Sequence, residues 1–456
     1  MLPETFSCMM CKAHDSSRQY SFIPFYSKPI MTPSLIKLTA MCAAVSAVAL
    51  SSVAQAQTTD PVVLTFSTVG DSRQDPSKVD STQKPMSQQD YNWLQNSKAW
   101  SRLMREISSK KANVLFFNGD MIMGYGNADV STVSTNSVAG VVNSDLVRYY
   151  TQSAFWRGMV APLIENGTYV VPVAGNHEVQ CRSGAVTTGT GIVASITSNT
   201  AWGNITCKDV NGNAATGKLG MKTNEDAWRA NYGDLIIDSA RMNAVLPAGQ
   251  TVANISATAP GAADGLSTDQ SKLSYSFDVG NNHFAIINTD PAGADSTAPA
   301  NWLSADFAAA QARGAQHFFV FGHKPAYTYF YNSSATAGGL DANAAGTANR
   351  DAFWSTIESY GATYFCGHEH TYNMSQPVIK NTDGTTRTSS AYQVLVGSGG
   401  SPFDAATLAA GEPVTDRYYA FANVRVFQSG KVQIDAYGFS DTYGPTKLLQ
   451  SVTLAH

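Results

Sequence analysis

Charged residues are scarce in this 456-residue chain, and the basic ones are scattered. Only 14% of the residues are Asp, Glu, Lys or Arg, and the formal net charge is −4. Neutralisation of phosphates by Lys and Arg dominates the binding of nucleic-acid duplexes, and the sequence has no Lys/Arg cluster. A nucleic-acid duplex is therefore not expected to be the main partner. Hydrophobic residues make up 43% of the chain, which suits a globular protein with a large core.

Long hydrophobic runs are also missing. One apolar stretch covers about residues 38–50, follows Lys37 and precedes Ala54-Gln55-Ala56. It is too short to span a bilayer stably, so we expect no stable membrane span. A basic flank, a short apolar segment and an Ala-x-Ala site are typical of a secretory signal peptide.

These features predict a signal peptide over residues 31–56, with Met31 as the start and cleavage before Gln57. Residues 1–30 are then an upstream extension, and residues 57–456 are the mature chain. Removal of residues 1–56 takes away four of 30 Lys/Arg and two of 34 Asp/Glu, which leaves 26 and 32 and a net charge of −6. We expect a periplasmic or secreted protein.

Cysteine is sparse as well. Cys8 and Cys11 belong to the predicted extension, and a lone Cys-x-x-Cys without a second pair is a weak metal motif. In the mature chain Cys181 and Cys207 are candidates for a disulfide, because an exported protein meets an oxidising compartment. Cys366 lies within an apolar run and is predicted to be a buried free thiol.

Histidine is rare, with eight residues in the chain, so His368 and His370 directly after one apolar run are conspicuous. Four other apolar runs lead in the same way into a block with glycine and acidic, amide or imidazole side chains. Each run is short and rich in β-branched or aromatic residues, and each is predicted to be a buried strand. The blocks are Gly70-Asp71-Ser72-Arg73, Asn118-Gly119-Asp120, Gly175-Asn176-His177-Glu178, Gly322-His323-Lys324-Pro325 and Gly367-His368-Glu369-His370.

These blocks point to a metal centre. Ligands of open α/β sheets bind beyond the carboxyl ends of the strands, and glycine beside each ligand permits a sharp turn away from the strand. Carboxylate, amide and imidazole donors suit Mn, Fe(II), Co or Zn, and a shared carboxylate can bridge two ions about 3.5–4 Å apart. Any one of these residues could instead be structural, but five such blocks in this order favour a ligand set.

The order of the blocks resembles that of the calcineurin-like metallophosphoesterases, including the purple-acid-phosphatase-like branch, from about Asp71 to the terminal strands. The resemblance implies two divalent metal ions bridged by Asp120. One ion would be held by Asp71 and His370. The other would be held by Asn176, His323 and His368.

The same resemblance gives His177 a role beside the metals. It would face the phosphoryl group as general acid or as a hydrogen-bond donor in the transition state. Glu178 would orient that imidazole or its loop, or would be an ordinary surface residue.

Two positions depart from the family pattern. Many relatives have Asp-x-His in the first block, but the third residue here is Arg73, which has no lone pair to give a metal. Arg73 is predicted either to clamp a phosphate oxygen or to form an ion pair with Asp75 or Asp71. Purple phosphatases have a tyrosine three residues after the bridging Asp, where this chain has Met123. The protein is therefore not expected to be purple, and Tyr125 is interpreted as a substrate-loop or packing residue.

The predicted fold class is α/β, a two-sheet α/β/β/α sandwich of the metallophosphoesterase type. Helices are predicted over residues 89–112, 151–164, 302–312 and 348–360. Further strands are predicted over residues 273–279, 283–289, 392–396, 422–427 and 432–436, the last two as a hairpin. An insertion at about residues 181–270 is expected to shape access to the site, unless it is a low-complexity linker. His283 and His317 are interpreted as structural, and Asp290 as a neighbour of the site or a capping residue.

The sequence thus predicts an exported metal-dependent phosphoesterase that acts on a small phosphorylated substrate through a metal-bound hydroxide. Phosphomonoesters are the favoured substrates. Phosphodiesters, nucleotides and pyrophosphates remain open alternatives, as does a non-catalytic protein that binds phosphate or metal.

Overall fold

The computed structural model describes residues 60–73, 97–183, 207–330, 338–342, 347–381, 383–404 and 417–454. All of them belong to one compact unit, Thr59–His456. The predicted extension (1–30) and signal peptide (31–56) lie outside the described residues, as does the N-terminal part of the helix predicted over 89–112.

Three parallel strands carry the first three polar blocks to one edge of a sheet. They are β1 (Val62–Val69), β2 (Val114–Phe117) and β3 (Tyr169–Pro172). Three antiparallel strands complete this sheet among the described residues, in the order β19-β18-β17-β1-β2-β3. They are β17 (Tyr418–Phe427), β18 (Val432–Ser440) and β19 (Lys447–Leu454). Parallel pairing of β1 to β3 places their carboxyl ends side by side, as the site requires.

A second sheet carries the two remaining blocks. Its strands in the described chain run in the order β13-β16-β12-β11-β10-β9-β8. Strands β10 (Asn282–Ile286), β11 (His317–Phe321), β12 (Thr363–Cys366) and β16 (Gln393–Val396) are parallel. Strands β13 (Tyr372–Ser375), β9 (Tyr275–Val279) and β8 (Val252–Ala253) are antiparallel to their neighbours. The blocks after β11 and β12 therefore leave this sheet at the same edge.

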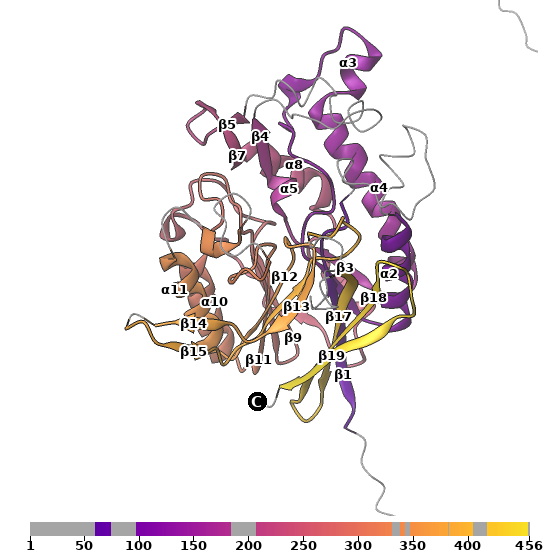
Figure 1. The fold of residues 1–456 in the computed structure, drawn as a ribbon, viewed down its shortest axis with the longest axis vertical. Coiled ribbons are helices and arrows are strands. Elements are labelled where there is room, and N and C mark those ends of the chain that lie inside the picture. The colour runs from indigo at the N-terminus through magenta and orange to yellow at the C-terminus, as the bar shows by residue number, and fades with distance from the viewer. Residues whose placement is uncertain are drawn as a thin grey trace, which may run out of the picture. The chain divides into compact units, whose positions relative to one another are not determined.

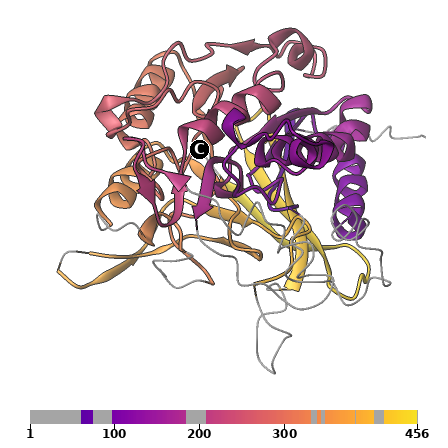
Figure 2. The same cartoon turned by 90° about the horizontal axis from the view of Figure 1, so that it is seen from above.

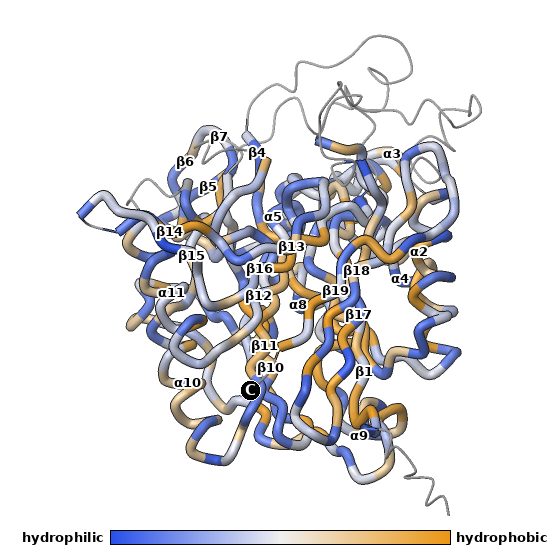
Figure 3. The backbone as a smooth tube through the Cα atoms, turned by 60° about the horizontal axis from the view of Figure 1, so that its bottom comes forward, coloured by the Kyte–Doolittle hydropathy of each residue, from blue (hydrophilic) through white to orange (hydrophobic). Residues whose placement is uncertain are grey.

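The two sheets pack against each other through phenylalanine rings. Phe116 of the first sheet lies over Phe321 of the second with 3.8 Å between ring centroids, and Phe66 contacts Phe284 and Phe319 edge to face. Each such pair contributes about 0.5–1.5 kcal/mol beyond the burial of its area. Hydrophobic, orange stretches accordingly run along the central strands of both sheets (Figure 3). This core aligns the strand ends of both sheets.

Helices cover the outer face of each sheet (Figures 1 and 2). Helices α2 (Ser97–Ser109), α4 (Asp145–Glu165) and α8 (Lys222–Tyr232) bury Trp100, Trp156 and Trp228 against the first sheet. Helices α10 (Ala300–Ala312) and α11 (Ala348–Ser359) pack on the second. The four-layer α/β/β/α sandwich predicted from the sequence is confirmed.

Part of the predicted insertion is folded rather than a linker. Helix α8 buries Trp228 and Tyr232 completely, and helix α9 (Ser239–Asn243) buries Met242. Strand β4 (Gln180–Ser183) pairs with β7 (Gly217–Gly220), and β5 (Cys207–Lys208) pairs with β6 (Ala214–Ala215). The predicted disulfide Cys181–Cys207 is present, with 5.8 Å between the Cα atoms, and Cys366 is a buried free thiol as predicted.

The sequence patterns did not predict several elements, of which the following are examples. They are the edge strand β19, the hairpin of β14 (Val378–Lys380) and β15 (Thr386–Thr388), the helices α3 (Val138–Val142) and α5 (Asn176–Val179), and three 3-10 turns at Val130–Thr132, Ala262–Asp264 and Leu340–Ala342. β15 is fully exposed and β19 has no fully buried residue. Such strands lack the alternating apolar pattern by which sequence reasoning finds strands.

His283 is a structural residue, as predicted, and gives the fold a pH dependence. Its Nδ1 lies 2.6 Å from Asp278 Oδ1 and its Nε2 lies 2.8 Å from Asp306 Oδ2, while Arg313 also contacts Asp278 at 3.0 Å. Burial lowers the pKa of His283, but the two carboxylates outweigh it and raise that pKa above its ordinary value.

A pKa raised by folding stabilises the fold fully below the unfolded value of about 6.5, and the contribution disappears as the pH rises through the folded value. We expect the free energy of unfolding to fall over that interval, and to fall less steeply in His283→Gln. Urea titrations at a series of pH values measure this difference. Equal pH slopes in both proteins would show that His283 is not the group responsible.

Candidate metal centre

All the predicted ligands lie just beyond the carboxyl ends of their strands. Asp71 follows β1, Asp120 follows β2, and Asn176 opens the short helix α5 after β3. His323 follows β11, and both His368 and His370 follow β12. Asp71 and His323 are completely buried, and of the six only His368 is more than slightly exposed. The five blocks therefore converge on one buried centre, as the sequence predicts.

Three of the ligands themselves have left-handed backbone conformations. The φ angles are 62° for Asp71, 55° for Asp120 and 75° for His368. Non-glycine residues pay about 1–3 kcal/mol for such conformations, which are concentrated at functional sites. The sequence predicts that glycines make the sharp turns, but at these three positions the ligand itself has the left-handed conformation.

The neighbouring glycines instead allow the loops after different strands to approach each other closely. A Cβ on Gly175 would lie 2.4 Å from the amide nitrogen of Asp120, and one on Gly367 would lie 2.3 Å from Oδ2 of Asp71. Neither contact is possible for a side chain. These glycines let the loops after different strands touch, which brings the ligands together.

Four donor atoms, which we call the second donor set, are linked by short distances around His323 Nε2: Asp120 Oδ1, Asn176 Oδ1, His323 Nε2 itself and His368 Nδ1. His323 Nε2 lies 3.1 Å from Asp120 Oδ1, 2.8 Å from Asn176 Oδ1 and 3.3 Å from His368 Nδ1. Asn176 Oδ1 lies 2.9 Å from His368 Nδ1. Ligands about 2.0–2.2 Å from one ion lie roughly 3–3.6 Å from each other, so these spacings fit a single divalent cation.

Hydrogen bonds behind this set orient its donors. His323 Nδ1 donates to the carbonyl of Asn118 at 2.7 Å, so in the neutral ring Nε2 carries the lone pair. Asn176 donates Nδ2 to the hydroxyl of Tyr125, which turns Oδ1 toward the histidines. Carboxylate, amide and imidazole donors at these distances need positive charge between them, which either a proton on His323, whose pKa Asp120 raises to about 9, or a metal ion would supply. The residues thus fit a metal ion.

The charges around the centre are strongly coupled. Burial raises the pKa of Asp71 well above its usual range, and the neighbouring Asp120 adds to the effect. Burial acts on Asp120 in the same direction, but His177, His323 and Arg73 outweigh it and hold its pKa well below the usual range. Burial lowers the pKa of His323, but Asp120 outweighs it and the pKa rises to about 9. Asp71, Asp120 and His323 each offer a ligand atom within 4.8 Å of the others.

Arg73 occupies the other side of Asp120. Its Nε lies 3.4 Å from Asp120 Oδ2, and its Nη2 lies 3.2 Å from His370 Nε2. The ion-pair alternative is thus realised with Asp120, where the sequence analysis named Asp71 or Asp75; Asp75 lies outside the described residues. Two unit charges about 4 Å apart repel by ~4 kcal/mol near a protein surface, and a divalent ion beside the guanidinium would double that. The first donor set, Asp71, Asp120 and His370, therefore fits a metal ion poorly.

His177 lies beside Asp120, as the predicted role requires. Its Nδ1 donates to the carbonyl of Met123 at 2.6 Å, its Nε2 lies 3.6 Å from Asp120 Oδ2, and its ring lies 3.8 Å from that of Tyr125. Burial and then the charge of Arg73 lower its pKa well below the usual value. The contacts with Met123 and Tyr125 hold the imidazole beside Asp120, the residue that both donor sets share.

Glu178 is a buried organiser of the loop after β2 rather than a surface residue. Its Oε2 accepts the amide N–H of Asp120 and of Gly175, both at 2.9 Å. Its Oε1 accepts those of Met121 at 2.8 Å and Ile122 at 3.0 Å. Four backbone donors on one carboxylate fix the turn that presents Asp120.

Two more carboxylates near the centre were missed by the sequence analysis. Asp404 accepts the amide N–H of His370 at 2.7 Å, and the carbonyl of Pro402 accepts from His370 Nδ1 at 2.7 Å. Glu369 is buried and accepts the amide N–H of Tyr329 and Phe330. Asp290, left open by the sequence, pairs with Lys324 Nζ at 2.5 Å. Asp404 lies outside the five blocks, and Glu369 stands between two predicted ligands without being one. The spacing of residues in the sequence therefore did not single out either carboxylate.

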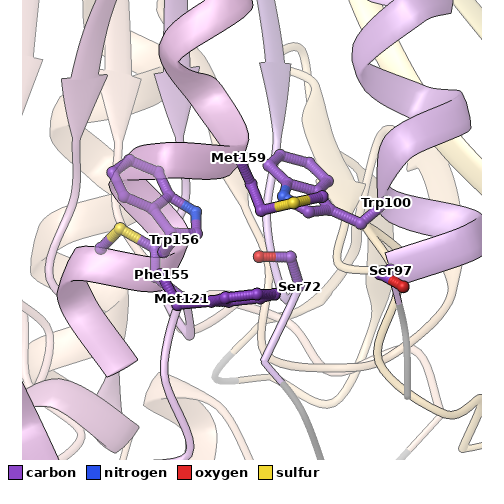
Figure 4. Close-up of a pocket in the computed structure, with 7 residues that line it drawn as sticks. All are labelled: Ser72, Ser97, Trp100, Met121, Phe155, Trp156 and Met159. Carbon is purple, nitrogen blue, oxygen red and sulfur yellow. The ribbon is translucent and has the colours of Figure 1, made fainter. Parts of the chain in front are cut away.

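A small pocket lies behind the first block (Figure 4). Ser72 and Met121, the neighbours of Asp71 and Asp120, form part of it. Ser97, Trp100, Phe155, Trp156 and Met159 line the rest. Figure 4 shows mostly aromatic and thioether side chains, together with the hydroxyl groups of Ser72 and Ser97. None of the six predicted ligands lines this pocket.

One family of known proteins matches most of the region that carries this site. The calcineurin-like phosphoesterase family matches residues 93–372, which is more than half of the chain. The chain therefore belongs to the calcineurin-like phosphoesterases. The matched range ends after His370 and begins after Arg73. No curated protein matches the sequence.

Solved structures with similar folds are distant in sequence. A purple acid phosphatase from yellow lupin seeds has 13% identity and a TM-score of 0.44, with 86% of this chain covered and 53% of that one. This chain thus spans about half the length of the lupin enzyme. A dimetal phosphatase from Danio rerio has 12% identity and a TM-score of 0.35, with 86% and 100% covered. GAP50, described as the anchor in the inner membrane complex of Plasmodium, has 12% identity and a TM-score of 0.36, with 86% and 89% covered.

Within the described ranges, no helix combines the length and the apolar character needed to cross a membrane.

Proposed function

We propose that this chain is an exported, metal-dependent phosphatase that hydrolyses small phosphomonoesters. The observation that carries the proposal is the second donor set, four donors around one buried point, with His177 and Arg73 at its border. Asp120, Asn176, His323 and His368 would hold a divalent ion there. Such an ion supplies Lewis-acid polarisation of a phosphoryl oxygen and lowers the pKa of water. The identity of the metal remains a prediction.

The protein's own residues would position the ester. Arg73 presents a planar guanidinium suited to two phosphoryl oxygens. In hydrolysis a water oxygen adds to phosphorus, the ester P–O bond breaks, and the leaving alkoxide takes a proton. His177 lies beside Asp120, with its Nε2 3.6 Å from Asp120 Oδ2, and its ring is fixed by Met123 and Tyr125. It is the residue we propose to deliver that proton, from Nε2 of its imidazolium form, because Nδ1 already donates to Met123.

His177→Asn tests this role through the leaving group. We expect hydrolysis of an alkyl phosphate to slow by about 10²–10⁴-fold, the usual size of general acid catalysis. Hydrolysis of an aryl phosphate with an acidic phenol should slow far less, because that leaving group needs no proton. Steady-state kinetics with both substrates measure the contrast. An equal loss for both would assign His177 to binding or structure instead.

Positive charge around the centre supports monoesters over diesters. Lys218 of β7 lies with Nζ 4.9 Å from the ring centroid of Tyr125, which itself packs on His177. Arg73 and Lys218 both lower the pKa of His177. A phosphomonoester carries up to two negative charges at neutral pH, whereas a diester carries one. Two cations near His177 therefore favour the dianion.

The monoester preference is tested by comparing wild type with Lys218→Gln on an aryl monoester and the corresponding diester. We expect kcat/KM to be higher for the monoester in wild type. In Lys218→Gln, KM for the monoester should rise about threefold to tenfold, as for one partly screened charge interaction of roughly 1 kcal/mol. Lys222→Gln is the matched control, because Lys222 is exposed and pairs with Asp226. A higher kcat/KM for the diester in wild type would contradict the proposed substrate class.

Export is the remaining part of the proposal. The disulfide Cys181–Cys207 supports it, because such bonds persist in oxidising compartments. N-terminal sequencing of the mature protein should begin at Gln57; an intact Met1 in the isolated protein would count against the proposed signal peptide.

A further inference from the structure

We propose that the guanidinium of Arg73 is the fixed cation of the first donor set, so that the centre binds one divalent ion rather than two. The inference rests on the proposed function and specifies it. Substrate would meet one metal ion, at the second donor set, and one arginine, at the place between Asp120 and His370.

The hydrogen bonds of His370 show that its Nε2 is already engaged. Its Nδ1 donates to the carbonyl of Pro402 at 2.7 Å, so in the neutral ring the lone pair is on Nε2. That lone pair faces Nη2 of Arg73 at 3.2 Å. A guanidinium only donates, so His370 accepts a hydrogen bond from Arg73 with the atom that a metal would need.

Asp120 divides its two oxygens between two cations. Oδ1 lies 3.1 Å from His323 Nε2, within the second donor set, and Oδ2 lies 3.4 Å from Nε of Arg73. With a divalent ion at the second donor set, the carboxylate of Asp120 would still bridge two positive charges. One of these charges is the guanidinium of Arg73, which belongs to the chain itself.

Arg73 is held in this place by its backbone and by its side chain. Its amide N–H donates to the carbonyl of Asp120 at 2.9 Å, and its carbonyl accepts from Ser401 Oγ at 3.2 Å. Nη1 contacts Met123 Sδ at 3.7 Å, and the residue is 8% exposed. This is a buried, anchored arginine, not a surface side chain that folds away when a metal arrives.

Among the described residues, the donors of the first set that remain are too few for a second ion. Oδ1 of Asp71 accepts no hydrogen bond from any described residue and lies 3.6 Å from His370 Nε2. It is the one donor of the first set that Arg73 does not engage. A transition-metal site needs three or four protein ligands. A lone carboxylate oxygen beside a guanidinium is instead an electrostatic partner for that guanidinium.

Metal stoichiometry tests the inference. Wild type, Arg73→His and Arg73→Lys would be stripped with chelator, reloaded with excess Mn²⁺, freed of loose metal and analysed for manganese per chain. We expect one Mn²⁺ per chain in wild type and in Arg73→Lys, which keeps the charge. Arg73→His exchanges the cation for an imidazole lone pair and should bind two. Electron paramagnetic resonance should show the hyperfine pattern of isolated Mn²⁺ in wild type and an exchange-coupled pair in Arg73→His.

Two Mn²⁺ per wild-type chain would overturn the inference while leaving the proposed function intact. One Mn²⁺ in both wild type and Arg73→His would also overturn it, because Arg73 would then not be what limits the stoichiometry. Failure of the proposed function looks different: no Mn²⁺ in any of the three proteins, together with no phosphoester hydrolysis. Circular dichroism of each variant, compared with wild type, confirms that the stoichiometry refers to folded protein.

Discussion

Replacing Asp120 by asparagine is expected to lower kcat/KM for an aryl phosphate by about 10³-fold or more, with loss of bound metal. Asparagine has the same shape, but it has no charge and replaces one oxygen by an amide group. Asp120 Oδ1 belongs to the second donor set and Oδ2 pairs with Arg73, so the substitution weakens both. Kinetics and metal analysis of the same sample measure the two losses together.

Asp226→Asn is the matched control for this substitution. Asp226 is exposed on α8 and pairs only at the surface, with Lys222 and Arg229. Its replacement should leave both metal content and kcat/KM within about twofold of wild type, since exposed ion pairs contribute little. Asp120→Asn with wild-type kcat/KM would contradict the site as described here.

Glu178→Ala is expected to be the most destabilising single substitution near the centre. It removes the acceptor of four buried amide N–H groups, from Asp120, Met121, Ile122 and Gly175. Unsatisfied buried donors cost about 1–3 kcal/mol each, and partial relaxation leaves an expected loss of roughly 3 kcal/mol or more in the free energy of unfolding. Urea titration measures that loss.

The same substitution should also reduce kcat. Release of the loop after β2 displaces Asp120, and misplacement by about 1 Å commonly costs about 100-fold in rate. Glu165→Ala, an exposed glutamate at the end of α4, is the control and should change neither quantity appreciably. A Glu178→Ala protein as stable as wild type would show that the loop holds its shape without the carboxylate.

The sequence was most informative where one rule acts on many residues. Buried strands are short apolar runs bounded by glycine, and the carboxyl ends of parallel strands lie at one edge of a sheet. The sequence alone therefore predicts that the side chains after these strands lie at one centre: Asp71, Asp120, Asn176, His323, His368 and His370. The sandwich followed from the same alternation of strands and helices. The disulfide Cys181–Cys207 followed from the predicted compartment.

What the sequence did not reveal depends on contacts between distant segments. Glu178 resembles a surface residue in the sequence, but the folded loop after β2 turns four amides toward it. The partner of Arg73 is 47 residues away in the loop after another strand, and Asp404 is reached only through the turn that follows β16. Edge elements such as β15 bury too little to leave a hydrophobic pattern. These features are set by tertiary geometry, which local sequence patterns do not encode.

The most direct test of the account is a titration of the metal-stripped mature protein with Mn²⁺ or Zn²⁺ while hydrolysis of an aryl phosphomonoester is followed. The account predicts no turnover after stripping, and recovery that rises in proportion to added metal and then levels off. Full turnover by the stripped protein would contradict it, and so would the absence of turnover with either metal at any loading.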